Sequence, residues 1–377
     1  MKKKIFFVTA SRADFGKLKS LIKITKKNSN FKVYIIITGM HMIPLYGNTF
    51  KEIQKFFRYN LIKFKNQNKG DKLEVVLNKT IKNFSRIVKK NRPDLIILHG
   101  DRIETLACAL VGSLNHILTG HIEGGELSGT IDDTIRHAVT KLCHIHFVGN
   151  DEAKKRIFKM GEHSNKIFNI GSPDMDIIFK KKRINIDYVK RRYGIKFKKF
   201  AILIWHSVTS ELKDLENNTK RLIKFINTLD INFIVIYPNN DPGSSIIINC
   251  YKKNLLKEKT KLFKSLRFEN FITLLKNSEF IIGNSSCAIY EAPALGIPSI
   301  NIGTRQKNRL NKNSIKNIDD LANLDLKEII MFLNSYKKEK ISYFGKGNTD
   351  KKFIKILKSK NLWNTSVQKY FSTSAVI

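Results

Sequence analysis

Short apolar runs rich in β-branched residues recur along the chain, and each is followed by a polar turn and then by a segment with helical periodicity. In the first half of the chain the apolar runs are Ile5–Thr9, Val33–Thr38, Leu95–His99, Ile117–Ile122 and Ile145–Val148. Helical periodicity follows, for example in Arg12–Lys26 and Glu104–Leu114. Continuous apolar runs of this length are typical of strands buried on both faces. Strands of this kind that are joined by helices predict an α/β protein with a parallel, doubly wound sheet.

The alternation pauses after Ser172-Pro173-Asp174, where a polar and lysine-rich stretch extends to about residue 199. It resumes with apolar runs at Phe200–Trp205, Phe233–Tyr237, Phe280–Ile282 and Pro298–Ile302. The pattern therefore predicts two Rossmann-like domains with a hinge near residues 175–190. We expect an N-terminal domain at residues 1–175, a C-terminal domain at residues 190–350 and a final segment, residues 351–377, that packs back across the joint.

Polar residues gather where the predicted strands end. They occupy Thr9–Asp14, Thr38–Met42, His99–Arg102 and HIEGGELSGTIDDTIRH (His121 to His137) in the first half, and His206–Thr209, Tyr237–Asp241, Gly283–Ser286 and Gly303–Arg305 in the second. Ligands of open α/β sheets bind beyond the carboxyl ends of the strands. The sequence therefore predicts a binding cleft between the two sheets, with these residues along it.

Length and composition narrow the class of protein further. A chain of 377 residues is long for one core, and its hydrophobic content of 42% is ample for two. The apolar runs fall short of the roughly 18 residues of a membrane span, and Arg12 and Asp14 interrupt the N-terminal run, which indicates a buried strand and not a signal peptide. The four cysteines form no CxxC pair, so we expect neither a zinc site nor disulfides, as suits a reducing cytoplasm.

The formal net charge of +37 raises the possibility of nucleic-acid binding. The lysines, however, are scattered through predicted helices, loops and the tail, and aromatic residues do not alternate with them as a base-stacking surface requires. This distribution favours solvated helix faces and no nucleic-acid partner. A positive surface would still attract an anionic substrate.

The acidic stretch after the fourth strand suits proton transfer. Asp101 and Glu123 each end a predicted central strand, so we expect them to be neighbours, with Asp132 nearby. Carboxylates crowded in a partly dry site repel each other, which raises at least one pKa and leaves an acid beside a base. The alternative for Asp132 or Asp133 is a cap of the helix that holds Arg136. His121 and His137 are more typical of structural histidines than of catalysts.

The residues after Phe280–Ile282 suit a phosphate. Gly283-Asn284-Ser285-Ser286 ends a strand and opens a predicted helix, Cys287–Leu295, so hydroxyl and backbone N–H groups could bind an anion, although ordinary N-capping by serine explains the pattern equally well. Glu291 on that helix could accept from ribose hydroxyls, and Arg305 could add a cation. Neither GxGxxG nor GxxxxGK[ST] occurs, so the usual dinucleotide and ATP loops are absent from the sequence.

Taken together, these motifs closely resemble the UDP-N-acetylglucosamine 2-epimerase family, and most of all its hydrolysing branch. The resemblance spans nearly the whole chain and rests on SRADFGKLK, TGMHM, HGDRIETLA, HIEGGELSGTIDDTIRH, NIGSPDMD, YPNND, SLRFENF and GNSSCAIYEAPALGIPSINIGTRQ in this order. It implies a GT-B-like architecture, a nucleotide-sugar substrate and no metal or redox cofactor. The implied products are N-acetylmannosamine, for sialic acid synthesis, and UDP. Family members are commonly dimeric.

The resemblance also implies roles for individual residues. Asp101, Glu123 and Asp132 match the acid/base positions, and Asp132 is preferred to Asp133 because it stands four residues before Arg136. The remaining matches are the phosphate-side Arg12, the cleft histidine His206, the phosphate-binding Ser285 and Ser286, the ribose contact Glu291 and the base-stacking Phe271. Without the family match, Phe271 is as easily a core residue of an amphipathic helix.

One motif departs from the family pattern and leaves the sugar open. The hydrolysing branch usually has HPVT where this chain has His206-Ser207-Val208-Thr209, and serine frees φ and restores an N–H, which can shift the loop that carries His206. Related enzymes act on UDP- or GDP-linked diacetamido sugars for legionaminic-type acids, and the motifs do not separate these substrates. A non-hydrolysing epimerase and a GT-B glycosyltransferase are the other enzyme classes compatible with the pattern.

Overall fold

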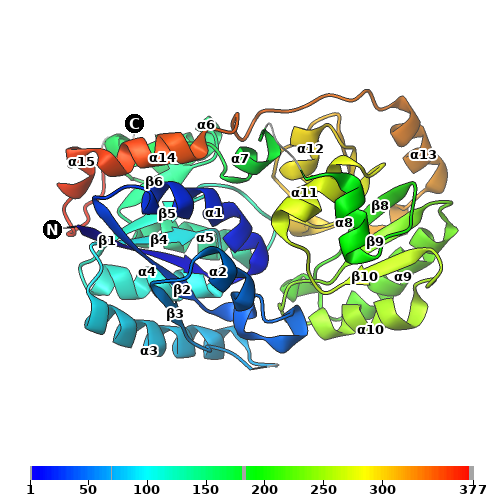
Figure 1. Ribbon diagram of the computed structural model, residues 1–377. Helices are drawn as coiled ribbons and strands as arrows, with labels where there is room; N and C mark the ends of the chain where they lie inside the picture. The colour runs from blue at the N-terminus through cyan, green and yellow to red at the C-terminus, as the bar shows by residue number, and fades with distance from the viewer. Residues whose placement is uncertain (1, 69, 181–183, 373–377) are drawn as a thin grey trace. The chain divides into compact units, whose positions relative to one another are not determined.

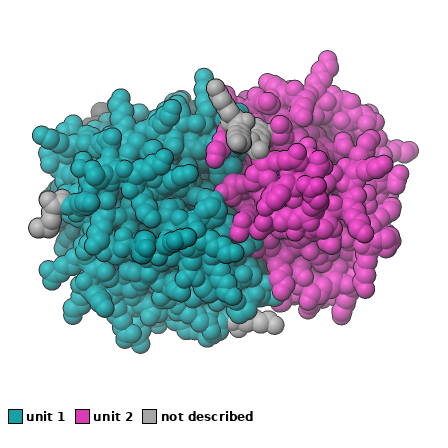
Figure 2. All heavy atoms as spheres, viewed as in Figure 1, with its two compact units in different colours: residues 1–126, 132–179, 344–377 teal, residues 127–131, 180–343 magenta. Residues whose placement is uncertain are grey.

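The computed structural model describes residues 2–68, 70–180 and 184–372. The chain forms two compact units, shown in Figure 2: unit 1 comprises residues 1–126, 132–179 and 344–377, and unit 2 comprises residues 127–131 and 180–343. Residues 181–183 of the lysine-rich stretch and residues 373–377 of the expected C-terminal segment lie outside the described residues.

Unit 1 is built on a seven-stranded parallel sheet in the order β3-β2-β1-β4-β5-β6-β7 (Figure 1). Its strands are β1 (Lys3–Thr9), β2 (Phe31–Ile37), β3 (Leu61–Lys63), β4 (Leu95–His99), β5 (Leu118–Ile122), β6 (Ile145–Val148) and β7 (Ile167–Asn169). All five apolar runs of the first half form strands, as the pattern predicts. The two unpredicted strands, β3 and β7, have three residues each and are too short to produce a recognisable run.

Helices cover both faces of this sheet. They are α1 (Arg12–Lys26), α2 (Phe50–Phe56), α3 (Leu73–Asn91), α4 (Ile103–Leu114), α5 (Ile131–Leu142), α6 (Asp151–Lys159), α7 (Asp174–Ile178), α14 (Thr349–Lys358) and α15 (Lys360–Trp363), with short 3-10 turns η1 (Gly39–Met42), η2 (Pro44–Tyr46) and η3 (Ser164–Lys166). One face packs against α1 and α14, which lie beside each other in Figure 1, and the other face packs against α3, α4 and α5.

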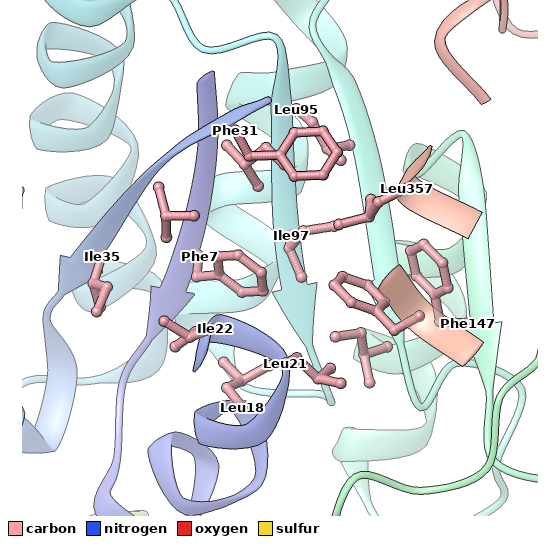
Figure 3. Close-up of a cluster of buried hydrophobic side chains, with 14 of the residues drawn as sticks. Phe7, Leu18, Leu21, Ile22, Phe31, Ile35, Leu95, Ile97, Phe147 and Leu357 are labelled. Carbon is pink, nitrogen blue, oxygen red and sulfur yellow. The ribbon is translucent and has the colours of Figure 1, made fainter. Parts of the chain in front are cut away.

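The C-terminal segment is part of the core of unit 1. Phe353 on α14 is fully buried, and its ring centroid lies 4.9 Å from that of Phe147 on β6 and 6.2 Å from that of Phe7 on β1. Leu357, one turn further along α14, reaches the same cluster, which Figure 3 shows between the sheet and α1. Truncating a phenylalanine buried in this way typically costs about 3–5 kcal/mol, so α14 stabilises the sheet that carries the predicted acids.

Unit 2 contains a second parallel sheet, with six strands in the order β10-β9-β8-β11-β12-β13. The strands are β8 (Phe200–Ile204), β9 (Asn232–Ile236), β10 (Thr260–Phe263), β11 (Ile281–Gly283), β12 (Ser299–Ile302) and β13 (Ile315–Ile318). The helices are α8 (Ile186–Tyr193), α9 (Leu215–Thr228), α10 (Ser244–Asn254), α11 (Phe268–Lys276), α12 (Glu291–Leu295) and α13 (Leu326–Ser335), with turns η4 (Thr209–Glu211), η5 (Ser286–Ala288), η6 (Thr304–Gln306) and η7 (Leu321–Asn323). Two parallel sheets therefore confirm the predicted α/β class.

Two details of the helices bear on the predictions. The single helix expected at Cys287–Leu295 is wrong: the structure has η5 and then α12, separated by Ile289 and Tyr290. Pro293 is the third residue of α12, where its missing N–H costs nothing because the first turn has no carbonyl partner for it. Among the described residues, the helices include none with both the length and the apolarity to cross a bilayer.

Candidate active site

Two of the predicted acids lie at the carboxyl ends of neighbouring strands in unit 1. Asp101 follows β4 by two residues and Glu123 follows β5 directly, and the register pairs His99 with Ile122. Glu123 has φ +62°, in the left-handed region that residues other than glycine rarely adopt. Backbone strain of this kind persists only where the surrounding structure enforces it. The hydrogen bond from the Glu123 N–H to the Phe147 carbonyl oxygen (2.9 Å) is one such constraint.

The Glu123 carboxylate accepts from three side chains, which lie on α1, on β4 and in the loop between β7 and α7. His99 Nε2 lies 3.0 Å and Lys17 Nζ 3.3 Å from Glu123 Oε2, while the Ser172 hydroxyl donates to Oε1. The other nitrogen of His99, Nδ1, lies 3.0 Å from Asp14 Oδ1. Both ring nitrogens of His99 therefore face carboxylates, as suits an imidazolium that donates from both.

Charge balance inside this cluster sets its protonation. Burial opposes the charged form of His99, but the Glu123 and Asp14 carboxylates outweigh it and raise the pKa of His99 to about 10. Burial likewise opposes ionisation of Glu123, yet Lys17, His99 and the Ser172 hydroxyl hold the pKa of Glu123 well below its ordinary value. Glu123 is therefore an ionised carboxylate in a nearly water-free position.

Asp174 is a functional candidate that the sequence argument did not identify. It begins α7 and is fully buried, with its Oδ2 2.8 Å from Lys17 Nζ and 3.3 Å from Ser172 Oγ. Burial and the charge of Glu123 outweigh the attraction of Lys17, and they raise the pKa of Asp174 to about 6. The sequence signal was NIGSPDMD, which follows an apolar segment too short to be recognised as β7.

Asp101 pairs with an arginine from α5. Arg136 is buried, and it donates from Nη2 to Asp101 Oδ2 and from Nη1 to Asp133 Oδ1 (3.3 Å) and to the Glu126 carbonyl oxygen (2.9 Å). Asp133 also lies 3.5 Å from His137 Nε2. Asp132 lies in the first turn of α5, where it is partly exposed. The structure thus brings Asp101, Asp133 and Arg136 into one ion-paired group.

Arg12 and His121 have partners in unit 1 that constrain them. Arg12 begins α1, and its Nε lies 3.0 Å from the buried Glu52 carboxylate on α2. His121 is fully buried in β5; its Nε2 donates to the Gly100 carbonyl oxygen (2.8 Å) and its Nδ1 accepts from Thr140 (3.1 Å). Burial lowers the pKa of His121 to about 3, so the ring is neutral at pH 7. His121 has the contacts of a structural histidine.

In unit 2, His206 follows β8 with its ring orientation set by the backbone. Its Nδ1 accepts from the Asn239 N–H (3.0 Å), so in the neutral ring the proton is on Nε2, which can then donate to a ligand. The His206 N–H donates to Asn284 Oδ1 (2.7 Å), and the Asn284 amide donates back to the His206 carbonyl oxygen (2.9 Å). Asn284 therefore holds the His206 loop to the end of β11.

The same asparagine connects a third loop. The backbone carbonyl oxygen of Asn284 accepts from Arg305 Nη1 (3.2 Å) and from Gln306 Nε2 (2.9 Å), both on the turn after β12. The predicted residues Ser285, Ser286 and Glu291 lie on the stretch that runs from the end of β11 through η5 to the start of α12. The loops after β8, β11 and β12 are thus tied together at one edge of the sheet, which is where an α/β protein binds its ligand.

Two of these residues are more enclosed than the sequence suggests. Glu291 is buried at the start of α12, where a carboxylate also complements the helix dipole. Phe271 on α11 is only 7% exposed, and its ring centroid lies 6.4 Å from that of Phe268. The burial of Phe271 is therefore compatible with the core position considered for it.

The middle of the acidic stretch belongs to unit 2. Residues 127–131 cluster with that unit, where the Gly129 N–H donates to the Arg305 carbonyl oxygen (3.1 Å) and Arg309 Nε donates to the Leu127 carbonyl oxygen (2.5 Å). A Cβ atom on Gly129 would lie 1.9 Å from the Thr304 carbonyl oxygen, so only glycine fits there. HIEGGELSGTIDDTIRH therefore contributes to both units.

These groups define what each unit can do chemically. Unit 1 offers an ionised carboxylate, Glu123, beside a second acid of raised pKa, Asp174, which suits proton abstraction and return. Unit 2 offers the His206 ring, the Arg305 guanidinium and small hydroxyl residues, which suit a polar or anionic ligand. Within residues 2–68, 70–180 and 184–372, no three His, Cys, Asp or Glu side chains converge to hold a metal ion.

Comparisons with known proteins agree with this organisation. A family model described as UDP-N-acetylglucosamine 2-epimerase matches residues 23–358. A UDP-N-acetylglucosamine 2-epimerase of Neisseria meningitidis serogroup B is 40% identical over 375 residues, which cover 98% of each chain. The UDP-N,N'-diacetylbacillosamine 2-epimerase (hydrolyzing) of Legionella pneumophila is 31% identical and covers 95% of this chain and 96% of its own.

A solved structure shows the same fold. The crystal structure of the Methanocaldococcus jannaschii UDP-GlcNAc 2-epimerase in complex with UDP-GlcNAc and UDP superposes with a TM-score of 0.79. It covers 95% of this chain and 99% of that chain at 20% sequence identity. The two parallel-sheet units therefore have the GT-B-like architecture that the sequence resemblance implies.

Proposed function

The chain belongs to the UDP-N-acetylglucosamine 2-epimerase family, and on that premise we propose that it is a hydrolysing 2-epimerase that converts UDP-N-acetylglucosamine and water to N-acetylmannosamine and UDP. The observation that carries the proposal is the buried Glu123 carboxylate, kept ionised by His99 and Lys17 and placed by a left-handed backbone at the end of β5. An ionised carboxylate can accept the C2 proton without first losing one of its own, which is the condition that a general base must meet.

The proposed reaction has two stages that balance. Glu123 takes the proton from C2, the C–H electron pair forms the C1–C2 double bond, and the C1–O bond breaks with its electrons leaving on UDP. Water then adds to the resulting 2-acetamidoglucal, its oxygen bonding to C1 and a proton returning to C2 on the opposite face. Asp101 and Asp132 are the remaining acid/base residues that we propose for this second stage.

The diphosphate needs neutralising charge and hydrogen-bond donors as it departs. We assign this role to Arg12, Arg136, Arg305, Ser285, Ser286 and the Nε2–H of His206. Glu291 would accept from the ribose hydroxyls, and Phe271 would contact the uracil ring. N-acetylmannosamine is a precursor of sialic acids, so the proposed product would enter that biosynthesis.

Incubation with UDP-N-acetylglucosamine in D2O, followed by NMR, tests the reaction. We expect free N-acetylmannosamine with deuterium at C2, together with UDP. A 2-epimeric product that still carries UDP would identify a non-hydrolysing epimerase. Transfer to an added sugar acceptor without reaction in water alone would identify a glycosyltransferase. Glu123→Gln is the matched variant, since it keeps the shape of the side chain and removes its basicity.

A UDP-linked diacetamido sugar is the second candidate substrate. It is supported by the similarity to the L. pneumophila enzyme, whose name specifies UDP-N,N'-diacetylbacillosamine. The same NMR assay with that substrate distinguishes the two candidates. The ratio of the two kcat/KM values identifies the preferred substrate. An additional acetamido group in a fitted site should change kcat/KM by one order of magnitude or more.

A further inference from the structure

Glu123 and Asp174 are two buried carboxylates that share two hydrogen-bond partners. Lys17 Nζ lies 3.3 Å from Glu123 Oε2 and 2.8 Å from Asp174 Oδ2. The Ser172 hydroxyl bonds to Glu123 Oε1 and lies 3.3 Å from Asp174 Oδ2. A chain of oxygens therefore runs from Glu123 through Ser172 to Asp174, and it ends away from solvent because Asp174 is fully buried.

The charges around this series of oxygens do not balance unless one proton is added. The acids are Asp14 on α1, Glu123 after β5 and Asp174 on α7, and the cations are Lys17 on α1 and His99 on β4. Three carboxylates against two cations leave one negative charge in excess in a dry cluster, which is costly. In addition, Asp174 Oδ1 is buried with no hydrogen-bond partner within the described part of the chain.

We propose that Ser172 and Asp174 form a proton relay behind Glu123, in which Asp174 stores the proton that Glu123 removes from the substrate. The inference rests on the proposed function. A proton that arrives on Glu123 passes to Ser172 Oγ while the hydroxyl hydrogen of Ser172 passes to Asp174 Oδ2. Glu123 is ionised again, Asp174 is neutral, and no bond other than O–H bonds has changed. After product release the proton returns by the same route to water at Glu123.

The relay has a thermodynamic direction. Glu123 is held ionised by two cations and a hydroxyl, so a proton on Glu123 is unstable, whereas burial and the charge of Glu123 favour a proton on Asp174. The two carboxylates titrate as a pair, and the first proton that the pair binds belongs on Asp174. Transfer from C2 to the pair is therefore more favourable than transfer to Glu123 alone. Ser172 and Asp174 act through Glu123 and are positioning residues.

Kinetics of four variants test the relay. Ser172→Ala removes the connecting hydroxyl, and Asp174→Asn removes the carboxylate that holds the proton. Each variant should lower kcat about ten-fold or more with little change in KM. Ser172→Thr keeps a hydroxyl and should recover most of the loss. Asp176→Asn, on the same helix, is the matched control: its carboxylate caps α14 through the Thr349 and Asp350 N–H groups, so it should lower the Tm and leave kcat unchanged.

The pH dependence of kcat is a second measurement, and a variant that only loses packing should not change it. In the wild type, kcat should fall as the pH drops below about 6, because Asp174 is then already protonated and cannot accept. In Asp174→Asn this acid limb should disappear and leave a low, flat rate. Wild-type kcat and an unchanged pH profile in both Ser172→Ala and Asp174→Asn would overturn the relay, whatever happens to the Tm.

A measurement without turnover separates this proposal from the proposed function. In protein labelled with 13C at the aspartate carboxyl carbons, the resonance missing from Asp174→Asn should titrate near pH 6. In Glu123→Gln it should titrate at lower pH, because the charge that favours the proton is gone. Titration of Asp174 in the ordinary aspartate range in both proteins would refute the proton store, even if neither candidate sugar is a substrate. A wild type that is inactive on both sugars but shows this titration would refute only the proposed function.

Discussion

His99 Nε2 lies 3.0 Å from Glu123 Oε2, and the opposite ring nitrogen lies 3.0 Å from Asp14 Oδ1, so one imidazolium links the first turn of α1 to the end of β5. A second buried pair in unit 1 has the same geometry: His146 Nε2 lies 3.0 Å from Glu162 Oε2. The two pairs differ in their position and in their other partners. Glu162 lies beyond the end of α6, and it also binds Lys141 and Lys369. They therefore make a matched comparison.

Replacing His99 with asparagine should move the acid limb of the kcat profile to higher pH. The positive ring lowers the pKa values of both Glu123 and Asp174, so its removal raises both and moves the acid limb that Asp174 sets to higher pH. We expect about a ten-fold loss of kcat near pH 6 and a smaller loss near pH 8. His146→Asn should reduce the Tm and leave the profile in place. The same profile in His99→Asn and the wild type would contradict the role of this ion pair.

The same histidine should make stability depend on pH in a predictable direction. The folded pKa of His99 is raised to about 10, so its stabilising effect is complete below its ordinary value of about 6.5 and is lost as the pH rises through 10. Glu123, whose pKa is lowered, stabilises above about pH 4.3 and loses this effect in acid. The difference in unfolding free energy between the wild type and His99→Asn, measured by urea denaturation, should therefore be largest at pH 5–6.5 and decline toward pH 10. A difference that grows with pH would contradict the assignment.

Asp132 and Asp133 should respond differently to removal of charge. Asp133 accepts from Arg136 and lies near His137, both in its own helix, so Asp133→Asn should cost about 1 kcal/mol of stability and less than ten-fold in kcat. Asp132→Asn should lower kcat by at least two orders of magnitude if Asp132 transfers a proton as proposed. Thermal unfolding and steady-state kinetics on both variants give the comparison. The reverse ranking would move the acid/base role to Asp133.

Gly129→Ala should loosen the loop that joins the acidic stretch to unit 2. A Cβ atom there would lie 1.9 Å from a backbone oxygen, which cannot retreat without breaking the Gly129–Arg305 hydrogen bond. We expect a loss of about 1–3 kcal/mol in unfolding free energy and a rise in KM. Gly149→Ala is the control, because its Cβ would meet its nearest neighbours at 3.6–3.8 Å, an ordinary contact. Equal stability of the two variants in urea would show that the loop is not held at Gly129.

Phe271→Leu separates base stacking from core packing. If the ring contacts the uracil, the variant should bind UDP about two- to twelve-fold more weakly, since stacking is worth about 0.5–1.5 kcal/mol. Phe268→Leu, on the same helix and equally buried, should lose stability alone. Calorimetric titration with UDP and thermal unfolding provide the two measurements. Equal UDP affinities in both variants would assign Phe271 to the core of unit 2.

Much of the site could be anticipated because strand ends are visible in the sequence. Asp101, Glu123 and His206 were identified as polar residues directly after apolar runs, and each follows a strand of the structure. Asp174 was missed because the preceding strand, β7, has three residues and gives no periodic signal. Lys17 was missed because nothing local shows that it meets Glu123, 106 positions away.

The sequence by itself determined the α/β class, the parallel sheets and the edge where the acids lie, since burial of β-branched runs and the period of the intervening helices are local properties. Only the tertiary structure decided the protonation of the acids and the left-handed backbone of Glu123. These depend on charges brought from α1, β4 and α7 into one dry cluster. Because electrostatic energies depend on distance and burial, neither of which the order of residues contains, they appear only once the chain is folded.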